Sequence, residues 1–346
     1  MVVVKADGYG HGAYPVATAA LHAGAVGVGV ALVDEAADLR DQGFDGSIFV
    51  LSEPPPDALV TAAELDVACT LYSLEGIAAA QLASREAGKV MSVHLKIDTG
   101  MHRVGADPTD ALALARLIDQ APELELAGTF THLAVADDPT DPLTEVQLDR
   151  FGAVCATIRD AGIDPGLVHA ANSAGAIAHP RARLDLVRIG IAAYGELPAP
   201  GLAPILADQL AGDVLKPVLS LRSSVHSVRR LAAGERTSYG QQYLLERGST
   251  VVTIPIGYAD GMPRSLAAGG GEVLIGGRRR RIAGTVTMDQ IIVDVGDDAV
   301  EVGDEVVLIG AQGDAEITAA EWGERTGTLA YEILSRIGTR IPRYVA

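Results

Sequence analysis

Lys5 closes the first apolar run of the chain and is the first residue in it whose chemistry is suggestive. Three consecutive valines precede it, which is typical of a buried strand, and a glycine-rich turn with Tyr9 and His11 follows. A lysine beside an apolar pocket loses solvation, so its amine is more often neutral and can attack a carbonyl carbon to form a Schiff base. The glycines would let backbone amides approach a phosphate at the start of the next helix. The alternative is a solvated lysine at a strand end, followed by an ordinary turn.

Other polar side chains stand at or near the ends of apolar runs. Lys96 and His132 close runs that predict strands, and Arg188 lies inside the apolar run 184–193. In a barrel of parallel strands, functional groups gather at the carboxyl ends of the strands, so this placement indicates a site. A guanidinium in an apolar run must be paired or functional. His132 taken alone also fits a hydrogen-bonded structural histidine.

Three further segments carry groups that bear on a site. Asn172 and Ser173 follow another candidate strand, where a hydroxyl and backbone amides would suit a phosphate, with an Asn-Ser turn as the alternative. In K-I-D-T-G-M-H-R-V-G, residues 96–105, a lysine and Arg103 become neighbours only if the loop folds back; otherwise the arginine lies on a surface turn. Tyr239 stands in the glycine-containing turn S-Y-G-Q-Q-Y, where a packed, half-buried ring is the alternative to a functional one.

The secondary-structure elements that must position these groups follow two sequence patterns. In the first, segments with apolar residues at helical spacing cover residues 13–23, 33–42, 73–87, 107–120 and 144–161. Between or beside them lie eight candidate strands: residues 1–5, 25–31, 47–51, 67–71, 91–97, 124–132, 167–170 and 184–191. This alternation predicts the α/β class and a (β/α)8 TIM-type barrel over residues 1–204, in preference to a doubly wound sheet.

The second pattern begins after a Pro- and Ala-rich stretch, residues 198–204, which predicts a linker. Short apolar or alternating runs separated by Gly-Asp turns predict a mostly antiparallel β domain over residues 205–346. The expected strands are residues 219–228, 251–257, 272–275, 281–286, 291–295 and 305–309, and the expected helices are residues 319–326 and 331–336. The basic run 278–281 follows two glycines and predicts a solvated hairpin.

Composition narrows the class of protein. The chain has 27 Lys and Arg against 45 Asp and Glu, a formal charge of −18, which argues against nucleic acid or an anionic membrane as the main partner. Cys69 and Cys155 sit in apolar stretches and form no metal or disulfide pattern, so we expect a cytoplasmic protein without a metal. No stretch of about twenty apolar residues predicts a membrane span, and the first residues lack the layout of a signal peptide.

The segment V-V-V-K-A-D-G-Y-G-H-G resembles the one that holds pyridoxal 5'-phosphate in the alanine racemase family, the fold-type III enzymes of that cofactor. Other segments resemble family motifs in the same order along the chain, from Lys5 to Tyr331. They are K-I-D-T-G-M-H-R-V-G at 96–105, S-Y-G-Q-Q-Y at 238–243, I-G-Y-A-D-G at 256–261, T-M-D-Q at 287–290 and A-Y-E at 330–332. In the fourth of these, Thr287 replaces the cysteine of the family.

The resemblance implies a set of roles. Lys5 would hold the cofactor and act as one catalytic base, and Tyr239 would be the other. A free phenol titrates near pKa ~10, so neighbouring cations must lower the pKa of Tyr239 before it acts as a base near neutral pH. Arg103 would bind the substrate carboxylate, and a carbamylated Lys96 would orient that arginine.

The remaining roles follow from the same resemblance. Arg188 would face the pyridine nitrogen and keep it unprotonated, and His132 would lie beside the ring. Tyr258 would narrow the substrate pocket, while the backbone at Met288 would help to bind the carboxylate. The residues implied at the phosphate and nearby are Tyr9, Asn172, Ser173, Gly190, Ile191 and Tyr331.

The activity implied is interconversion of L-alanine and D-alanine, supplying D-alanine for peptidoglycan, by a head-to-tail homodimer whose partner donates Tyr239, Tyr258 and Met288. A serine or broad-specificity amino-acid racemase shares these residues and remains an alternative. A non-catalytic pyridoxal-phosphate-binding barrel is a second alternative, but it predicts neither a second domain nor the Tyr239 motif. The family usually has a longer segment before the cofactor lysine, whereas four residues precede Lys5, so we expect exposed apolar surface on one flank of the barrel.

Overall fold

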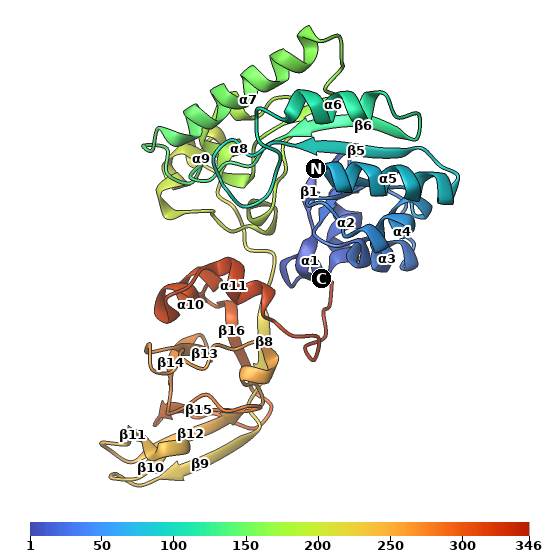
Figure 1. Ribbon diagram of the computed structural model, residues 1–346. Helices are drawn as coiled ribbons and strands as arrows, with labels where there is room; N and C mark the ends of the chain where they lie inside the picture. The colour runs from blue at the N-terminus through green and yellow to red at the C-terminus, as the bar shows by residue number, and fades with distance from the viewer. Residues whose placement is uncertain (346) are drawn as a thin grey trace. The chain divides into compact units, whose positions relative to one another are not determined.

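Seven short parallel strands follow one another in sequence order in the first part of the chain (Figure 1). The computed structural model describes residues 1–345. The strands are β1 (Val2–Val3), β2 (Val28–Val30), β3 (Ile48–Val50), β4 (Val67–Leu71), β5 (Met91–Lys96), β6 (Leu124–Phe130) and β7 (Leu167–His169). Each pairs in parallel with the next, as expected for strands joined by crossover helices.

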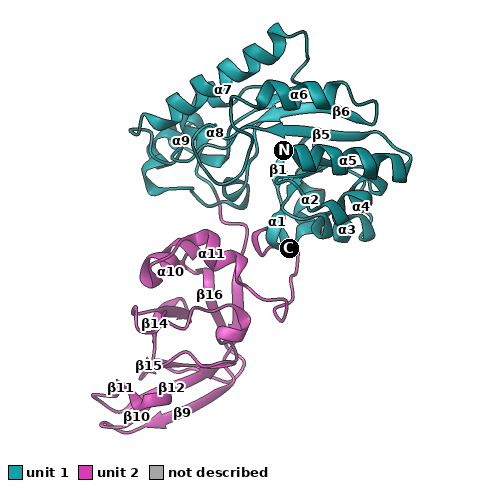
Figure 2. Cartoon of the chain, viewed as in Figure 1, with its two compact units in different colours: residues 1–8, 12–215 teal, residues 9–11, 216–346 magenta. Residues whose placement is uncertain are grey.

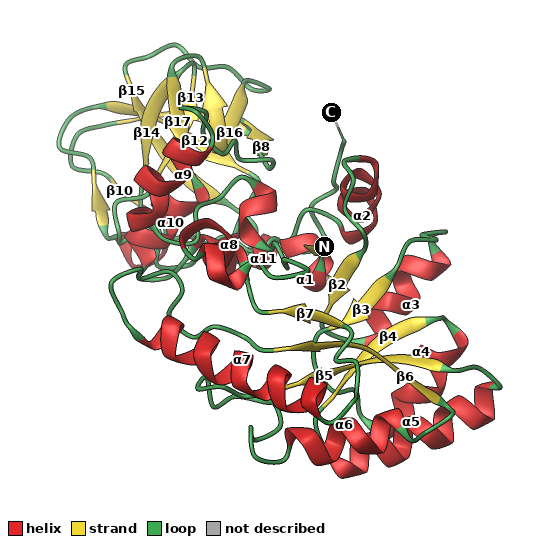
Figure 3. Ribbon diagram, turned by 90° about the horizontal axis from the view of Figure 1, so that it is seen from above, coloured by secondary structure: helices red, strands yellow, loops and turns green. Residues whose placement is uncertain are grey.

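The helices between these strands lie along the outer side of the sheet (Figure 3). They are α2 (Ala13–His22), α3 (Val33–Asp41), α4 (Leu59–Glu64), α5 (Leu74–Ala87), α6 (Ala111–Asp119) and α7 (Leu143–Asp160), and after β7 come α8 (Ser173–Ala178) and α9 (Ala203–Gln209). The prediction of an α/β barrel with parallel strands is therefore confirmed at the level of the fold class. Helices α4, α8 and α9 were missed, since six or seven residues are too few to show a clear period.

The predicted eighth strand is wrong as a regular strand. Within residues 184–191 the ladder is reduced to one parallel bridge, between Ile189 and Val2. Backbone bonds still tie this segment to both neighbours: Arg188 N–H donates to Ala171 after β7, and Val3 N–H donates to Ile189 O. The segment thus occupies the eighth position of the barrel as an extended chain.

A left-handed turn replaces the predicted end of the first strand. The segment labelled α1 (Lys5–Tyr9) has Ala6 at φ 53° and ψ 51°, Asp7 at φ 52° and ψ 50°, and Gly8 at φ 60° and ψ 45°. These are left-handed dihedral angles, which cost L-residues roughly 1–2 kcal/mol each. β1 is therefore confined to Val2–Val3, and Lys5 opens the turn instead of closing the strand.

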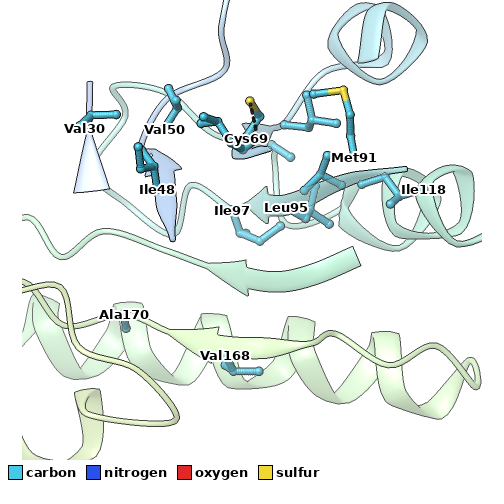
Figure 4. Packing of buried hydrophobic residues seen from close by; sticks show 14 of the residues in the cluster. Val30, Ile48, Val50, Cys69, Met91, Leu95, Ile97, Ile118, Val168 and Ala170 are labelled. Carbon is cyan, nitrogen blue, oxygen red and sulfur yellow. Dashed lines mark hydrogen bonds between the residues drawn. The ribbon is translucent and has the colours of Figure 1, made fainter. Parts of the chain in front are cut away.

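The core of this part of the chain is aliphatic. Figure 4 shows Val30, Val50, Cys69 and Leu95 among its buried side chains, contributed by neighbouring strands. Helix α6 adds Ile118, which is fully buried. This helix begins four residues later than predicted, because the carboxylate of Asp107 accepts the Thr109 amide and holds a turn there.

The chain divides into two units, residues 1–8 with 12–215 (unit 1) and residues 9–11 with 216 onward (unit 2), shown in separate colours in Figure 2. The stretch predicted as a linker, 198–204, forms η4 (Pro200–Leu202) and leads into α9 within unit 1. Other 3₁₀ turns are η1 (Pro56–Ala58), η2 (Pro180–Ala182), η3 (Ile191–Tyr194), η5 (Tyr239–Gln241) and η6 (Tyr258–Asp260).

Unit 2 is built on antiparallel strands, as predicted. The main sheet has the order β17-β16-β13-β14-β15-β12-β9, with β8 also paired to β16, and β10 and β11 form a separate pair. The strands are β8 (Leu221–Ser224), β9 (Ser227–Leu231), β10 (Arg236–Thr237), β11 (Tyr243–Leu244), β12 (Ser249–Ile254), β13 (Glu272–Ile275), β14 (Arg278–Ile282), β15 (Ile291–Gly296), β16 (Glu305–Gln312) and β17 (Ala315–Ile317); the helices are α10 (Ala319–Thr326) and α11 (Ala330–Ser335).

The basic run 278–281 lies in the hairpin formed by β13 and β14, which confirms the predicted hairpin. Its four arginines are part of strand β14, whereas the sequence predicted a strand that begins at the last of them. The expected strand 281–286 is consequently shifted to Arg278–Ile282. Acidic neighbours explain why four cations are tolerated on one short strand: Arg279 pairs with Glu321 at 2.7 Å and with Glu272 at 3.1 Å. Among residues 1–345, no helix has both the length and the apolar character needed to cross a membrane.

Candidate active site

The backbone that carries Lys5 is held by a carboxylate from a neighbouring helix. Glu35 lies in the first turn of α3, and its Oε1 accepts the amide of Ala6 at 2.6 Å. Its Oε2 accepts the amides of Ala31 at 2.7 Å and Leu32 at 3.2 Å. Because Ala6 is left-handed, such a bond offsets part of the conformational cost and fixes the start of the turn.

Two lysines of unit 1 have amines that lose their protons more readily than usual. Burial lowers the pKa of Lys5 most, the charge of Arg103 lowers it further, and Glu35 acts in the opposite direction. Burial, with help from Arg103 and Arg188, lowers the pKa of Lys96 to about 8. Neutral amines are the form that a nucleophile or a general base requires.

The loop after β5 folds back, which answers whether Lys96 and Arg103 can be neighbours. Lys96 O accepts the amide of Ala106 at 2.8 Å, and Asp98 N–H donates to Ala106 O at 2.9 Å. Inside the loop, Asp98 Oδ1 accepts three successive amides, from Gly100 to His102, at 2.9–3.1 Å. The loop returns Arg103 close enough to lower the pKa of both Lys5 and Lys96.

Arg188 is a buried cation, only 3% exposed. Its Nη1 donates to His169 Nδ1 at 2.7 Å, and its Nη2 donates to the carbonyls of Thr131 at 2.8 Å and Ala170 at 2.9 Å. Nη2 also lies 3.4 Å from Nδ1 of His132. Burial lowers the pKa of Arg188 to about 9, so the guanidinium remains charged at neutral pH.

His132 lies within this group of cations. Burial lowers its pKa well below the usual value, and Arg188 and Arg103 add to the effect. The imidazole is therefore neutral at physiological pH, with one nitrogen available as an acceptor. Unit 1 thus brings Lys5, Lys96, Arg103 and His132 into electrostatic contact with one another, as the sequence-based site requires.

The residues expected at a phosphate in unit 1 also lie together. Ser173 Oγ accepts the amides of Gly190 at 2.9 Å and Ala192 at 3.4 Å, which brings the hydroxyl to the start of η3, where Ile191 stands. Asn172 has a structural task, because its Oδ1 caps α8 by accepting the Gly175 amide at 2.8 Å. The Asn-Ser turn therefore exists alongside any role in binding.

In unit 2, Tyr239 is 75% exposed on a turn held to the neighbouring backbone. Ser238 Oγ donates to Thr285 O at 2.8 Å, and Thr285 Oγ1 donates to Tyr239 O at 3.2 Å. The packed, half-buried ring is thus found elsewhere in the motif, at Tyr243, whose hydroxyl donates to Asp294 at 2.9 Å. The phenol of Tyr239 is presented to solvent on a fixed backbone.

Tyr258 and Met288 come from segments that pack directly on each other in unit 2. Tyr258 N–H donates to Thr287 O, and Ala259 N–H donates to Met288 O, both at 3.0 Å. A Cβ on Gly257 would lie 2.2 Å from Met288 O, so glycine is required for this approach. Both side chains remain exposed, Tyr258 by 42% and Met288 by 52%.

The aromatic rings of the last two expected residues, Tyr9 and Tyr331, lie near each other. Tyr9, which is grouped with unit 2, lies with its ring centroid 6.1 Å from that of Tyr331 at the start of α11. Burial raises the pKa of Tyr9 to about 12, so its hydroxyl stays protonated and can donate a hydrogen bond.

Sequence reasoning missed Glu35 and His94. Glu35 had a visible signal, since an acidic residue in the first turn of a predicted helix commonly bonds nearby amides. His94 precedes Lys96 by two residues on β5, so the alternation of a strand places both on the same face. Among the described residues, no group of three or more histidine, cysteine or acidic side chains is arranged to hold a metal ion.

Chemically, the residues brought together in unit 1 combine amines of lowered pKa with buried positive charge. Such a set favours an anionic ligand that has a carbonyl group, because the cations attract the anion and a neutral amine attacks the carbonyl. Pyridoxal 5'-phosphate fits this description. Unit 2 carries the exposed phenol of Tyr239 and the exposed side chains of Tyr258 and Met288.

Comparisons with known proteins cover both units. Residues 1–198 match the family model for the alanine racemase N-terminal domain, and residues 218–345 match the model for the alanine racemase C-terminal domain. The chain is 45% identical to alanine racemase of Symbiobacterium thermophilum, over 99% of this chain and 89% of that protein. It is 42% identical to alanine racemase of Thermobifida fusca, over 99% of this chain and 90% of that protein.

Solved structures agree with these sequence matches. The crystal structure of alanine racemase from D-cycloserine-producing Streptomyces lavendulae superposes with a TM-score of 0.91 at 39% identity, covering 99% of this chain and 89% of that one. The structure of alanine racemase from Bacillus anthracis with bound L-Ala-P gives a TM-score of 0.91 at 38% identity, covering 99% and 86%.

Proposed function

The chain belongs to the alanine racemase family, and from that premise we propose that it is a pyridoxal-phosphate-dependent enzyme that interconverts L-alanine and D-alanine. One observation carries the proposal. In unit 1, two lysine amines of lowered pKa, those of Lys5 and Lys96, lie within the electrostatic reach of buried or nearby arginines. Arg103 acts on both lysines, and Arg188 acts on Lys96. Both relatives at 42–45% identity are alanine racemases, and this chain covers 89–90% of their length.

The residues that would hold the cofactor are those described above. Lys5 would bind it covalently through its amine, and the phosphate would take donors from Ser173, from the amides of Gly190 and Ile191, and from the hydroxyls of Tyr9 and Tyr331. When bound, pyridoxal 5'-phosphate acts as an electron sink that makes the Cα proton of an amino acid acidic. Arg188 would donate to the ring nitrogen and keep it unprotonated, since a guanidinium does not give up its proton readily.

Inversion at Cα requires proton transfer on opposite faces of the carbon. We assign one face to the Nζ of Lys5 and the other to the hydroxyl of Tyr239. A neutral amine accepts a proton directly, whereas a phenol needs neighbouring cations to lower its pKa from ~10. Arg103 would bind the substrate carboxylate with two parallel hydrogen bonds.

A second copy of the chain would complete the site. Tyr239, Tyr258 and Met288 of unit 2 are 42–75% exposed, so their side chains are accessible to a partner. We propose a head-to-tail homodimer in which these residues enter the partner's site. There Tyr258 would limit the substrate to a small side chain, and the backbone at Met288 would assist Arg103.

Two further parts of the proposal rest mainly on the resemblance. Lys96 would be carbamylated and would orient Arg103; the lowered pKa of its amine supports this, because carbamylation consumes the neutral form. The reaction would take place in the cytoplasm and supply D-alanine for peptidoglycan.

Circular dichroism below about 230 nm tests the activity. The purified chain, incubated with pyridoxal 5'-phosphate and L-alanine, is expected to reduce the optical signal of alanine to zero, with L-serine run in parallel. Comparable decay with serine would favour a broad-specificity racemase. A visible cofactor band with no decay for either amino acid would instead favour a non-catalytic binding protein and contradict the proposal.

A further inference from the structure

The buried guanidinium of Arg188 has an unusual set of partners. Buried cations are normally paired with a carboxylate, because an unpaired charge in a low-dielectric interior is costly. Among the described residues, however, the acceptors within hydrogen-bond reach of Arg188 are all neutral: two backbone carbonyls and the imidazoles of His169 and His132. The strength of these neutral acceptors therefore matters for keeping the cation in place.

The contact between Arg188 and His169 continues to a second buried imidazole. His169 is fully buried and His94 is 6% exposed. Nε2 of His169 lies 2.9 Å from Nδ1 of His94, and Nη1 of Arg188 lies 2.7 Å from Nδ1 of His169. Three polar groups from β5, β7 and the segment after β7 thus form one continuous chain of hydrogen bonds.

The direction of that chain is fixed by chemistry. A guanidinium only donates, so Nδ1 of His169 must present a lone pair to Arg188. A neutral His169 then carries its proton on Nε2 and donates to Nδ1 of His94. Nδ1 of His94 must accept, which places the proton of that ring on Nε2. Burial lowers the pKa of His94 to about 4 and that of His169 well below its usual value, so both rings are neutral.

The strand next to β5 is shaped to admit the ring of His94. Gly128 of β6 is the register partner of His94, beside an irregularity in the ladder. A Cβ on Gly128 would lie 2.3 Å from Nδ1 of His94, the atom that accepts from His169. Aromatic rings pack against this chain of hydrogen bonds. The ring centroid of Phe49 lies 4.4 Å from that of His94, and the ring of Phe130 is stacked on that of His169 with 4.8 Å between centroids.

We propose that His94 is a positioning residue, which holds Arg188 through His169 by a one-way chain of hydrogen bonds from Arg188 to His169 to His94. By accepting a hydrogen bond from Nε2–H of His169, His94 fixes the tautomer that leaves Nδ1 of His169 free to accept from Arg188. His94 therefore orients the cation and leaves its positive charge in place, whereas a carboxylate in the same position would neutralise that charge. The consequence for pyridoxal 5'-phosphate rests on the proposed function, whereas the chain of hydrogen bonds does not.

The chain is tested first without cofactor, by nitrogen-15 NMR of histidine-labelled protein. His94→Phe and His169→Phe variants assign the two rings. Both histidines are expected as Nε2–H tautomers that do not titrate near neutral pH. A His169 ring protonated on Nδ1, or one that becomes charged near its ordinary pKa, would overturn the proposal.

Variants then separate positioning from packing. His94→Phe keeps an aromatic ring against Phe49 but cannot accept a hydrogen bond, whereas His94→Asn places an oxygen near the position of Nδ1. We expect His94→Phe to bind pyridoxal 5'-phosphate about tenfold more weakly and to shift the visible band of the bound cofactor, and His94→Asn to restore much of both. His179→Phe, at another buried histidine of unit 1, is the matched control and should change neither.

The outcomes are distinct. Native-like affinity and spectrum in His94→Phe would show that His94 only fills space, and would contradict the proposal. If His94→Phe does not fold, His94→Asn decides, because weak binding and a shifted band in a folded His94→Asn variant would equally contradict it. If the native chain binds no pyridoxal 5'-phosphate, the proposed function fails, while the tautomers seen by NMR still test the hydrogen-bond chain.

Discussion

The carboxylate of Glu35 accepts the backbone amide of Ala6 at 2.6 Å, one residue beyond Lys5. Its other oxygen accepts the amides of Ala31 and Leu32, so a single side chain joins the start of α3, the end of β2 and the left-handed turn. The same carboxylate raises the pKa of Lys5, against the stronger effects of burial and Arg103. Glu35 therefore acts on both the backbone and the charge of the proposed catalytic lysine.

Replacing Glu35 by glutamine should separate these two effects. Glu35→Gln loses one acceptor oxygen and the negative charge, so we expect the free energy of unfolding to fall by about 1–2 kcal/mol. The pKa of Lys5 should fall further, because a charge that stabilised the ammonium form is removed. Labelling of Lys5 by acetic anhydride, followed by peptide mass spectrometry across pH, should show a midpoint at lower pH than in the native chain.

Asp34→Asn provides the control for this measurement. Asp34 precedes Glu35 on α3, is exposed, and carries the same charge. Its substitution should leave the labelling midpoint of Lys5 nearly unchanged. Equal shifts in both variants would mean that Lys5 responds to general charge, and that the specific contact with Glu35 has no part in it.

Strain in the left-handed turn gives a second pair of expectations. Ala6 has φ 53° and Gly8 has φ 60°. Glycine adopts such angles without steric cost, so Ala6→Gly should raise the free energy of unfolding by up to about 1 kcal/mol, despite the greater freedom it gives the unfolded chain. Gly8→Ala should lower it by ~1 kcal/mol or more, because the added Cβ would also lie 3.3 Å from backbone atoms of Ala13. Urea denaturation of both variants measures the changes, and a destabilised Ala6→Gly would show that the turn is not strained.

The fold could be predicted from the sequence where the pattern was strong. Apolar runs such as β4 and β5 and the long helix α7 were placed within a few residues, because periodicity directly reflects which face is buried. The prediction of an eighth strand was wrong: residues 184–191 are apolar, but among the described residues they form a single bridge. Local hydrophobicity does not determine whether a segment pairs in a regular ladder. The left-handed turn was also out of reach, because its backbone conformation depends on Glu35, 29 residues after Ala6.

The site shows the same division. Arg188 could be selected from sequence because a charged residue inside an apolar run needs a reason to be there. Lys96 was selected as a strand-end residue, and Arg103 only through the resemblance of its segment to the family motif. His94 was passed over, because one histidine in a strand carries no such signal until its partner, 75 residues away, is known. Whether Tyr239 was packed or exposed also required the structure, which shows Tyr243 as the anchored ring.

Tyr239→Phe tests the proposed second base. The side chain is 75% exposed, so the substitution should change the free energy of unfolding by less than about 0.5 kcal/mol. Racemisation should slow by roughly 10²–10⁴-fold, the usual contribution of a positioned acid or base. In deuterium oxide with pyridoxal 5'-phosphate, one enantiomer of alanine should still exchange its Cα proton faster than it racemises, because Lys5 serves that face alone.

Proton NMR of each enantiomer measures this exchange, with Tyr344→Phe as control at another exposed tyrosine of unit 2. Tyr344→Phe should racemise alanine at the native rate. Equal loss of exchange for both enantiomers in Tyr239→Phe would contradict a role on one face, and an unchanged racemisation rate would contradict any role in proton transfer.

Lys96 provides a prediction about pH and about carbon dioxide. Its pKa is lowered to about 8 in the folded chain, whereas an unfolded lysine has a pKa of about 10.4. Between these values the unfolded chain binds a proton that folded Lys96 does not, so this lysine makes the free energy of unfolding rise with pH, by up to about 3 kcal/mol across the interval. Urea denaturation of the native chain and of Lys96→Met, in bicarbonate-free buffer, should show a steeper rise in the native chain, since the lowered pKa of Lys5 contributes to both. With bicarbonate present, a carbamylated Lys96 would bind no proton, whereas the lysine of the unfolded chain still takes one up, so the rise with pH should persist and extend below pH 8. Isotopically labelled bicarbonate should then give a carbamate signal by NMR. Parallel curves without bicarbonate would contradict the lowered pKa, and the absence of a carbamate signal would contradict the modification.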